Sequence, residues 1–273
     1  MPSLRRGLGC IGGLRLETSA RSHRVARASP KEMDDLKDAC CKEFVKVVRA
    51  ASMASASVSR GLMQDVRVEL ELRLGRHGDD GAAFVSGLGE AHFQRILSCL
   101  ESYGGWTRVV DWNNFDDIFF DVELEGSRVE VRSRVTYDGE IHVESITKKR
   151  VMDKVLDLRV AGLCVRPAVA LEKIIENQCL PASVVPKHVR LRRRKSFVIG
   201  STVLPGEVFR FDVTLTWVAA TKYEAEKAMR SVPPIMEVEL ECLRTNEYVQ
   251  QTSAARLAES MFAKIADFLS EIE

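Results

Sequence analysis

The sequence predicts a mainly β (α+β) fold, a closed antiparallel β-barrel with a charged lumen and peripheral helices. Two segments far apart in the chain, 68–74 (VELELRL) and 237–241 (EVELE), alternate carboxylates with apolar residues, which is the period of a β-strand. Three more segments, 128–134, 189–194 and 210–216, carry arginines on the same period. If the sheet closes into a barrel, these charged faces point inward and the apolar faces pack outward against helices.

Either acidic segment alone is better explained as a strand with a solvated acidic face. Like charges on one strand face repel each other, however, unless a cation lies between them. The basic strands provide one source of positive charge, and a hard divalent metal with oxygen ligands provides another. Charges of both signs on converging faces therefore favour a lumen that holds a strongly anionic ligand, a cation, or both.

The basic run 192–195 (RRRK) has a second interpretation, as a nuclear-import or nucleic-acid patch. Such a patch does not need alternation with apolar residues. The apolar residues around this run, Val189, Leu191, Phe197 and Ile199, favour a strand instead.

Amphipathic segments provide helices that can cover the apolar outer faces of the strands. Helices are expected over residues 32–50, 90–102, 223–230 and 253–271. The clearest is 90–102, in which Phe93, Ile96, Leu97 and Leu100 follow the i, i+3, i+4, i+7 pattern. Four aromatic residues are expected in the same outer packing: Phe119, Phe120, Phe211 and Trp217.

The length of 273 residues allows one large domain, or at most two. We expect a disordered, Arg-rich tail over residues 1–30 and a single domain over 31–273, with the barrel over about 64–245. The tail holds six arginines and one acid, a composition that also suits an organellar transit peptide. The remaining 34 Lys/Arg and 38 Asp/Glu leave a net charge near −4, which excludes a protein that coats nucleic acid generally.

Two further features bear on the compartment. No apolar run approaches the length of a membrane span, so no membrane association is expected. The seven cysteines are odd in number and include no Cys-x-x-Cys pair, which is typical of reduced thiols in the cytosol or nucleus.

From about residue 66 to 243, the sequence resembles the metal-dependent RNA 5′-triphosphatases of fungi, protozoa and some viruses, which are triphosphate tunnel metalloenzymes. The resemblance rests on three strand motifs in order: Glu-x-Glu followed by Arg, Arg-x-Asp-x-Thr, and Glu-x-Glu-x-Glu. The matching residues are Glu69, Glu71 and Arg73, then Arg210, Asp212 and Thr214, then Glu237, Glu239 and Glu241. Thiamine-triphosphatase and adenylate-cyclase-like relatives open on Glu-x-Glu-x-Lys, so Arg73 favours the RNA branch.

Further matches extend the resemblance, and those of Arg132, Lys148 and Glu172 are the looser ones. A basic strand running into Ser196-Phe197 corresponds to Arg192 and Arg194. The family's Ile-x-Lys-basic-basic-Val segment resembles residues 146–151, which contain Lys148, and its upstream arginine resembles Arg132. The family's single mid-chain glutamate resembles Glu172. The last three depend on register, because a slip of one residue turns a side chain to the other face of its strand.

The resemblance implies a hydrolase that depends on Mg²⁺ or Mn²⁺ and releases the γ-phosphate from the 5′-triphosphate end of nascent RNA, the first step of mRNA capping. It implies metal ligands at Glu69, Glu71 and Glu241, and activation of water by Glu172. Phosphate contacts are expected from Arg132, Lys148, Arg192, Arg194 and Arg210. The residues expected to brace the lumen are Arg73, Asp212, Thr214, Glu237 and Glu239.

Other functions remain compatible with the same residues. One is a phosphatase for inorganic tripolyphosphate, thiamine triphosphate or a free nucleoside triphosphate. Another is a non-catalytic module that binds polyphosphate or RNA ends. For the capping function we expect a nuclear location, a separate guanylyltransferase, and a monomer or homodimer.

Overall fold

The structure is a computed structural model of the 273-residue chain. It describes residues 38, 42, 45–46, 66–78, 84–124, 126–137, 140–153, 156–160, 163–175 and 184–270. In chain order its elements are β1 (Val66–His77), β2 (Phe84–Val85), α2 (Glu90–Ser102), β3 (Arg108–Leu124), β4 (Ser127–Tyr137), β5 (Ile141–Asp153), β6 (Leu156–Val160), β7 (Leu163–Ile175), β8 (His188–Gly200), β9 (Glu207–Ala219), α3 (Lys222–Ser231), β10 (Ile235–Cys242), α4 (Thr245–Gln251) and α5 (Ala254–Ser270).

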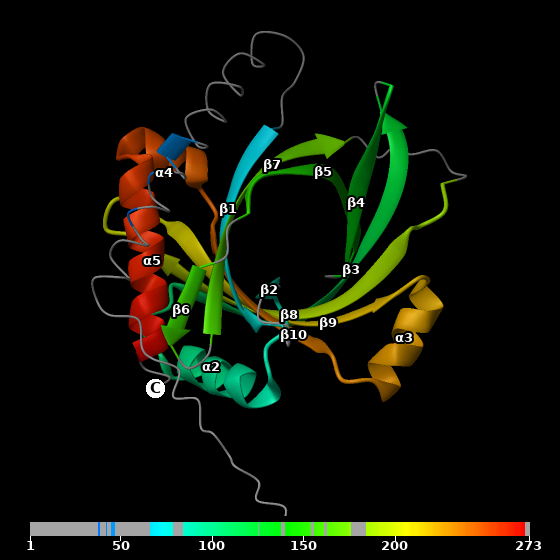
Figure 1. The fold of residues 1–273 in the computed structure, drawn as a ribbon, viewed down its shortest axis with the longest axis horizontal. Coiled ribbons are helices and arrows are strands. Elements are labelled where there is room, and N and C mark those ends of the chain that lie inside the picture. Colours follow the sequence, from blue (N-terminus) through cyan, green and yellow to red (C-terminus); the bar gives the residue numbers. More distant parts are fainter. Residues whose placement is uncertain are drawn as a thin grey trace, which may run out of the picture.

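The described strands form a closed antiparallel barrel, as the sequence predicts (Figure 1). The order around the wall is β1-β10-β9-β8-β3-β4-β5-β7, and β1 pairs with β7 to close the ring of eight. The short strands β2 and β6 extend the sheet beyond β1 and β7. Closure leaves each of the eight strands with a hydrogen-bonded neighbour on both sides, so the ring has no exposed edge.

The apolar core lies outside the barrel wall, between the strands and the helices. Helices α2 and α5 cover one side of the barrel, with α3 on the opposite side (Figure 1). The largest cluster of buried residues joins the outward faces of β1, β9 and β10 to Phe93 and Ile96 of α2 and to Leu257 and Met261 of α5. Burying one such side chain contributes about 1.5–3 kcal/mol, so this layer holds the wall in place.

Three of the expected helices are present within a residue or two of their predicted bounds, as α2, α3 and α5. Helix α3 begins with a capping box, in which the backbone N–H of Glu224 donates to the Thr221 hydroxyl and the backbone N–H of Thr221 donates to the Glu224 carboxylate. Of the helix expected over 32–50, the structure describes four helical residues, 38, 42, 45 and 46. The rest of that segment, and the tail over 1–30, lie outside the described residues. None of the described helices has the length and apolar character that crossing a membrane requires.

The placement of Phe119 differs from the sequence-based expectation. Phe119 pairs with Arg132 on β4 and with His188 on β8, and all three lie on the lumenal side of the wall. Its ring stacks on His188 with centroids 4.3 Å apart, and the guanidinium of Arg190 lies 4.8 Å above it. The expectation of outer packing is therefore wrong for Phe119, whereas Phe211 does lie in the outer core.

Candidate functional site

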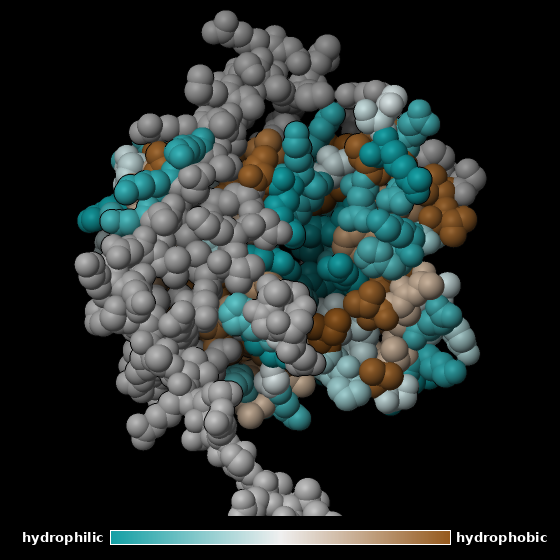
Figure 2. Space-filling model, in the orientation of Figure 1, coloured by the Kyte–Doolittle hydropathy of each residue, from teal (hydrophilic) through white to brown (hydrophobic). Residues whose placement is uncertain are grey.

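A cavity of about 300 Å³ opens at one mouth of the barrel. In the space-filling view it is a hollow with hydrophilic residues inside it and along its upper and right edges (Figure 2). The described residues that line it are Arg67, Val68, Glu69, Glu71, Arg73, Arg132, Arg134, Glu144, Lys148, Glu172, Arg192, Arg194, Arg210, Glu239, Glu241, Cys242 and Leu243. The barrel therefore encloses a site built mainly from side chains that carry full charges of both signs.

Strand alternation sets which charges enter this cavity. On β8, Arg192 and Arg194 line the lumen, whereas Arg193 between them is exposed on the outside, with its guanidinium 5.4 Å from the Trp112 ring. On β1 the inward residues Glu69, Glu71 and Arg73 alternate with leucines that are buried in the outer core. A period of two residues along the backbone is thus sufficient to separate a charged interior from an apolar exterior.

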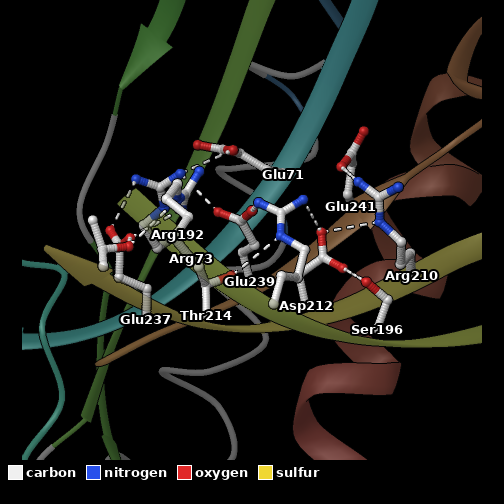
Figure 3. A network of polar contacts seen from close by, with 12 residues as sticks. Glu71, Arg73, Arg192, Ser196, Arg210, Asp212, Thr214, Glu237, Glu239 and Glu241 are labelled. Atoms are coloured by element: carbon white, nitrogen blue, oxygen red, sulfur yellow. Dashed lines mark hydrogen bonds and ion pairs between the residues drawn. The ribbon is translucent and has the colours of Figure 1, made fainter. Parts of the chain in front are cut away.

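On the wall formed by β8, β9 and β10, the charged side chains around Arg194 are paired with one another (Figure 3). Arg194 donates from Nε to Thr214 at 3.2 Å and from Nη2 to Glu239 at 3.0 Å, and its Nη1 lies 2.7 Å from Asp212. Asp212 is 0 % exposed and also accepts from Ser196 at 2.5 Å. The buried charges of Arg194 and Asp212 therefore have the partners that burial requires.

Deeper in the same wall, Arg192 is held by three partners. It donates to Asp117 at 3.3 Å, to Glu237 at 3.0 Å and to Thr216 at 3.3 Å. Burial acts to raise the pKa of Asp117, but the charges of Arg134 and other arginines outweigh it and hold that pKa well below its usual range. This carboxylate is therefore ionised across the physiological range and keeps Arg192 in position.

Glu239 and Glu241 on β10 differ in electrostatic environment. Burial acts to raise the pKa of Glu239, but Arg73 and Arg194 lower it well below its ordinary value. Burial raises the pKa of Glu241 to about 7, and the charges of Glu69, Asp212 and Glu239 add to this, against the 2.5 Å ion pair with Arg210. An acid with so high a pKa lacks sufficient positive charge around it, so a cation beside Glu241 would be favourable.

The opposite side of the cavity gathers acids from β1 and β7 around one lysine. The Nζ atom of Lys148 forms an ion pair with Glu69 and lies 3.9 Å from both Glu71 and Glu172. Arg132 reaches Glu172 through a long hydrogen bond of 3.4 Å. Burial raises the pKa of Glu172, and the neighbouring charge of Glu69 raises it further.

Several polar atoms on this side have no hydrogen-bond partner. They include Glu71 Oε1, Arg132 Nε and Arg73 Nε, all buried. Glu71 is only 3 % exposed, so its unpartnered carboxylate oxygen destabilises the fold unless a ligand supplies a partner for it. The donor set fits a hard divalent cation at the carboxylates and phosphate oxygens at the guanidinium groups. In the described residues, however, no three acidic, His or Cys side chains already converge as a metal cluster.

The structure brings all fourteen predicted site residues to the lumenal face, including Arg132, Lys148 and Glu172, whose register was least secure. Lys148 pairs with Glu172 across β5 and β7, and the irregularity in that pairing falls after Arg150, beyond both residues. Three of the fourteen, Asp212, Thr214 and Glu237, lie behind the cavity lining and contact residues that form it.

Sequence reasoning missed several lumenal residues. Arg134 lines the cavity and donates to Asp117 at 2.8 Å, and Arg67 and Glu144 form an exposed ion pair of 3.2 Å near its mouth. Arg134 follows Arg132 on the same alternating face, a signal that was sufficient to find it. Asp117 belongs to β3, whose sequence alternates poorly, so its direction was not readable.

Comparison with solved structures relates the fold to RNA triphosphatases. The Schizosaccharomyces pombe (S. pombe) Pct1 RNA triphosphatase aligns with a TM-score of 0.54 and 11 % identity, over 90 % of this chain and 95 % of that one. The same S. pombe protein in complex with the Spt5 CTD aligns with a TM-score of 0.58 and 13 % identity, with the same coverage. A Mimivirus capping enzyme triphosphatase aligns with a TM-score of 0.50 and 14 % identity, over 89 % and 99 %. At these identities the likeness concerns the fold.

Comparisons of the sequence itself give no relative. No protein-family model matches the chain, and no curated protein matches it.

Proposed function

We propose that this protein is a divalent-cation-dependent hydrolase that releases the γ-phosphate from the 5′-triphosphate end of RNA, the first step of mRNA capping. The observation that carries the proposal is the incompletely paired side of the lumen, where Glu71, Lys148, Glu172 and Arg132 converge and leave buried polar atoms without partners. A ligand with both a cation and phosphate oxygens satisfies all of them. The barrel shared with RNA triphosphatases supports the same conclusion.

The carboxylates of Glu69, Glu71 and Glu241 are proposed to hold the cation, Mg²⁺ or Mn²⁺. When bound, the cation would stabilise negative charge on the phosphate oxygens as a Lewis acid. Glu71 contributes the unpartnered Oε1, and Glu241 contributes a carboxyl whose pKa is raised to about 7 by burial and neighbouring acids.

Binding of the phosphates is proposed for Arg132, Lys148, Arg192, Arg194 and Arg210, which all line the cavity. Phosphoryl transfer depends chiefly on positioning and on stabilising charge, which these cations provide. Glu172 is proposed to accept a proton from the attacking water. Its raised pKa brings it closer to neutral pH, which improves a general base, and its neighbours Arg132 and Lys148 orient it.

The cavity itself favours a second candidate, a phosphatase for free triphosphates such as tripolyphosphate or nucleoside triphosphates. Among the described lining residues there is no aromatic ring on which a base could stack. The site therefore grips the triphosphate, and any selectivity for RNA must come from groups outside the cavity. The capping proposal therefore includes RNA-selective groups outside the cavity. It also includes a nuclear location and a separate guanylyltransferase as partner.

The deciding experiment measures γ-phosphate release from triphosphate-ended RNA, tripolyphosphate, thiamine triphosphate and ATP side by side, with Mg²⁺ and with Mn²⁺. We expect turnover of the RNA end with Mg²⁺, and slower or Mn²⁺-dependent turnover of the free nucleotide. Glu172→Gln should bind substrate and still fail to hydrolyse it, with a loss of roughly 10²–10⁴-fold, because an amide cannot accept the proton. Turnover of tripolyphosphate or thiamine triphosphate with none on RNA would reject the capping assignment, and tight binding without turnover would indicate a binding module.

A further inference from the structure

The rear end of the lumen, opposite the mouth, contains an aromatic side chain from β2. In Figure 1, β2 is drawn faintly, at the back and within the outline of the barrel. β2 pairs with the end of β1, with Phe84 opposite His77 and Val85 opposite Arg76. His77 continues the inward-facing series of β1, so Phe84 faces the lumen and Val85 faces away from it.

The absence of a side chain at Gly75 leaves the room that Phe84 occupies. Gly75 follows Arg73 by two residues and therefore also faces the lumen. A Cβ placed on Gly75 would lie 2.3 Å from Cζ of Phe84 and 2.5 Å from its Cε2. The ring of Phe84 thus rests directly on the lumenal backbone of β1.

Contacts on three sides fix the segment that carries Phe84. Arg166 pairs with Arg73 across β7 and β1, and its guanidinium lies 4.6 Å above the Phe84 ring. Ser86 donates to Glu237 at 3.3 Å, and the backbone N–H of Leu88 donates to the carbonyl oxygen of Met236 at 2.8 Å. Glu237 in turn holds Arg192, so the position of Phe84 is connected to the phosphate-binding wall.

The charged cavity ends before this rear segment, because neither Phe84 nor Arg166 belongs to its described lining. On the opposite wall, Arg190 lies beyond Arg192, with a buried Nε that has no hydrogen-bond partner. A phosphate chain that slid past Arg192 would meet this cation if the rear were open. An apolar ring cannot provide hydrogen bonds to a phosphate and so stops the chain there.

We propose that Phe84 is a stop that determines which phosphoanhydride bond is cleaved, an inference that rests on the proposed function. The terminal phosphate enters first, since the other end of the substrate carries the nucleoside, and it halts before Phe84. Water then adds to the terminal phosphorus, the bond to its bridging oxygen breaks, and one inorganic phosphate leaves. A chain that slid one phosphate deeper would consume the same single water and release pyrophosphate instead.

The test uses a nucleoside 5′-tetraphosphate and the ratio of phosphate to pyrophosphate among the products. The wild-type protein should release phosphate and leave the nucleoside triphosphate, which it then shortens further by one phosphate at a time. Phe84→Ala should raise the share of pyrophosphate at least about tenfold, since a tenfold change of partition corresponds to only ~1.4 kcal/mol. Val85→Ala, next to it but facing outward, is the matched control and should leave the ratio unchanged.

A binding measurement separates this inference from the proposed function. Affinities for inorganic tripolyphosphate and linear tetraphosphate are compared by calorimetry in the wild-type protein and in both variants. Phe84→Ala should improve the tetraphosphate affinity about tenfold relative to tripolyphosphate, because the added phosphate can reach Arg190. Absence of turnover in all proteins would reject the hydrolase, and the affinity ratio would still decide the role of Phe84. A folded Phe84→Ala protein with an unchanged affinity ratio, or with an unchanged product ratio, would overturn the inference.

Discussion

The two sides of the lumen differ in how completely their charges are paired. On the wall of β8 and β9, Arg194 contacts Thr214, Asp212 and Glu239 through three different nitrogen atoms. On the side of β1, β4 and β7, Arg132 has one long hydrogen bond to Glu172 and a buried Nε without a partner. We call the side around Arg194 saturated and the side around Arg132 unsaturated, because Arg194 has a partner at each of its three nitrogen atoms and Arg132 does not.

The paired residues hold the barrel, whereas the residues with unpartnered atoms gain contacts when a ligand binds. A buried charge with full hydrogen bonding is stable by itself and gains little from a further contact. A buried atom without a partner costs about 1–3 kcal/mol, and a ligand that supplies the partner recovers that free energy on binding. The unsaturated side thus offers the larger gain, and the saturated side offers a fixed frame against which the phosphates are placed.

The largest expected effect is the loss of turnover when a glutamate on the unsaturated side is neutralised. Glu71→Gln should lower turnover by at least about 10⁴-fold, or ~5.5 kcal/mol, since it removes a proposed ligand of the cation. Its unfolding free energy should change by less than about 1 kcal/mol, because the weaker bond from Arg73 to Oε2, 3.2 Å long, is offset by the loss of a buried charge whose Oε1 has no partner. Steady-state kinetics and denaturant unfolding of the same preparation give both quantities.

Glu237→Gln is the matched variant on the saturated side. Glu237 is 5 % exposed and accepts from Arg192, Thr216 and Ser86, so its neutralisation should destabilise the fold by about 1–3 kcal/mol. Turnover at a temperature where it is folded should stay within about tenfold of wild type. Equal loss of turnover in both variants would contradict the division of the lumen into a ligand side and a frame.

The next prediction compares neighbouring arginines of β8, in which inward and outward residues alternate, so the outward one is the control. Arg192→Ala and Arg194→Ala should each cost roughly 2–5 kcal/mol in transition-state stabilisation, because a buried charge pair loses one member. Both variants should also lower the midpoint of thermal unfolding, because buried carboxylates lose a partner. These carboxylates are Asp117 and Glu237 for Arg192, and Asp212 and Glu239 for Arg194. Arg193→Ala lies one residue away on the exposed face and should change both by less than about 0.5 kcal/mol. Equal losses at all three positions would mean that the outward face also takes part in the site.

Much of the frame was predictable from the sequence because its signal is local. Alternation along β1, β8, β9 and β10 decides by itself which side chains share a face, and charge cannot remain on a face that packs against helices. The lumenal positions of Glu71, Arg194, Asp212 and Glu239 followed from that rule alone. Helices α2 and α5 were predictable for the same reason, from one apolar stripe each.

The remaining features depend on contacts between distant segments. β3 has a register shift between Val110 and Asn113, and aromatic and acidic residues lie on both of its faces, so the direction of Phe119 was not readable. The position of Phe84 depends on a fold-back of β2 against Gly75, which no periodicity marks. The contrast between saturated and unsaturated charges depends on distances across the lumen, which only the closed ring sets.

The smallest expected effect is a pH dependence that comes from Glu241, a carboxyl at the boundary between the two sides. Its pKa is about 7 in the folded protein and 4.5 as the ordinary value, because burial and neighbouring acids disfavour the charged form. Between these values the folded state holds one proton more than the unfolded state. The contribution of Glu241 to the unfolding free energy should therefore be fully present below about pH 4.5 and be lost as the pH rises through 7.

The loss should amount to less than about 3 kcal/mol, since the side chain of Glu241 is 22 % exposed and solvent screens part of the effect. Denaturant unfolding of wild type and Glu241→Gln from pH 5 to 8, without divalent cations, measures it as the difference between the two curves. Adding Mn²⁺ should remove the difference in slope between wild type and Glu241→Gln below about pH 7, because a cation at Glu241 favours the ionised form. Parallel curves for the two proteins without the cation would show that Glu241 is ionised throughout, and the saturated side would then extend to Arg210 and Glu241.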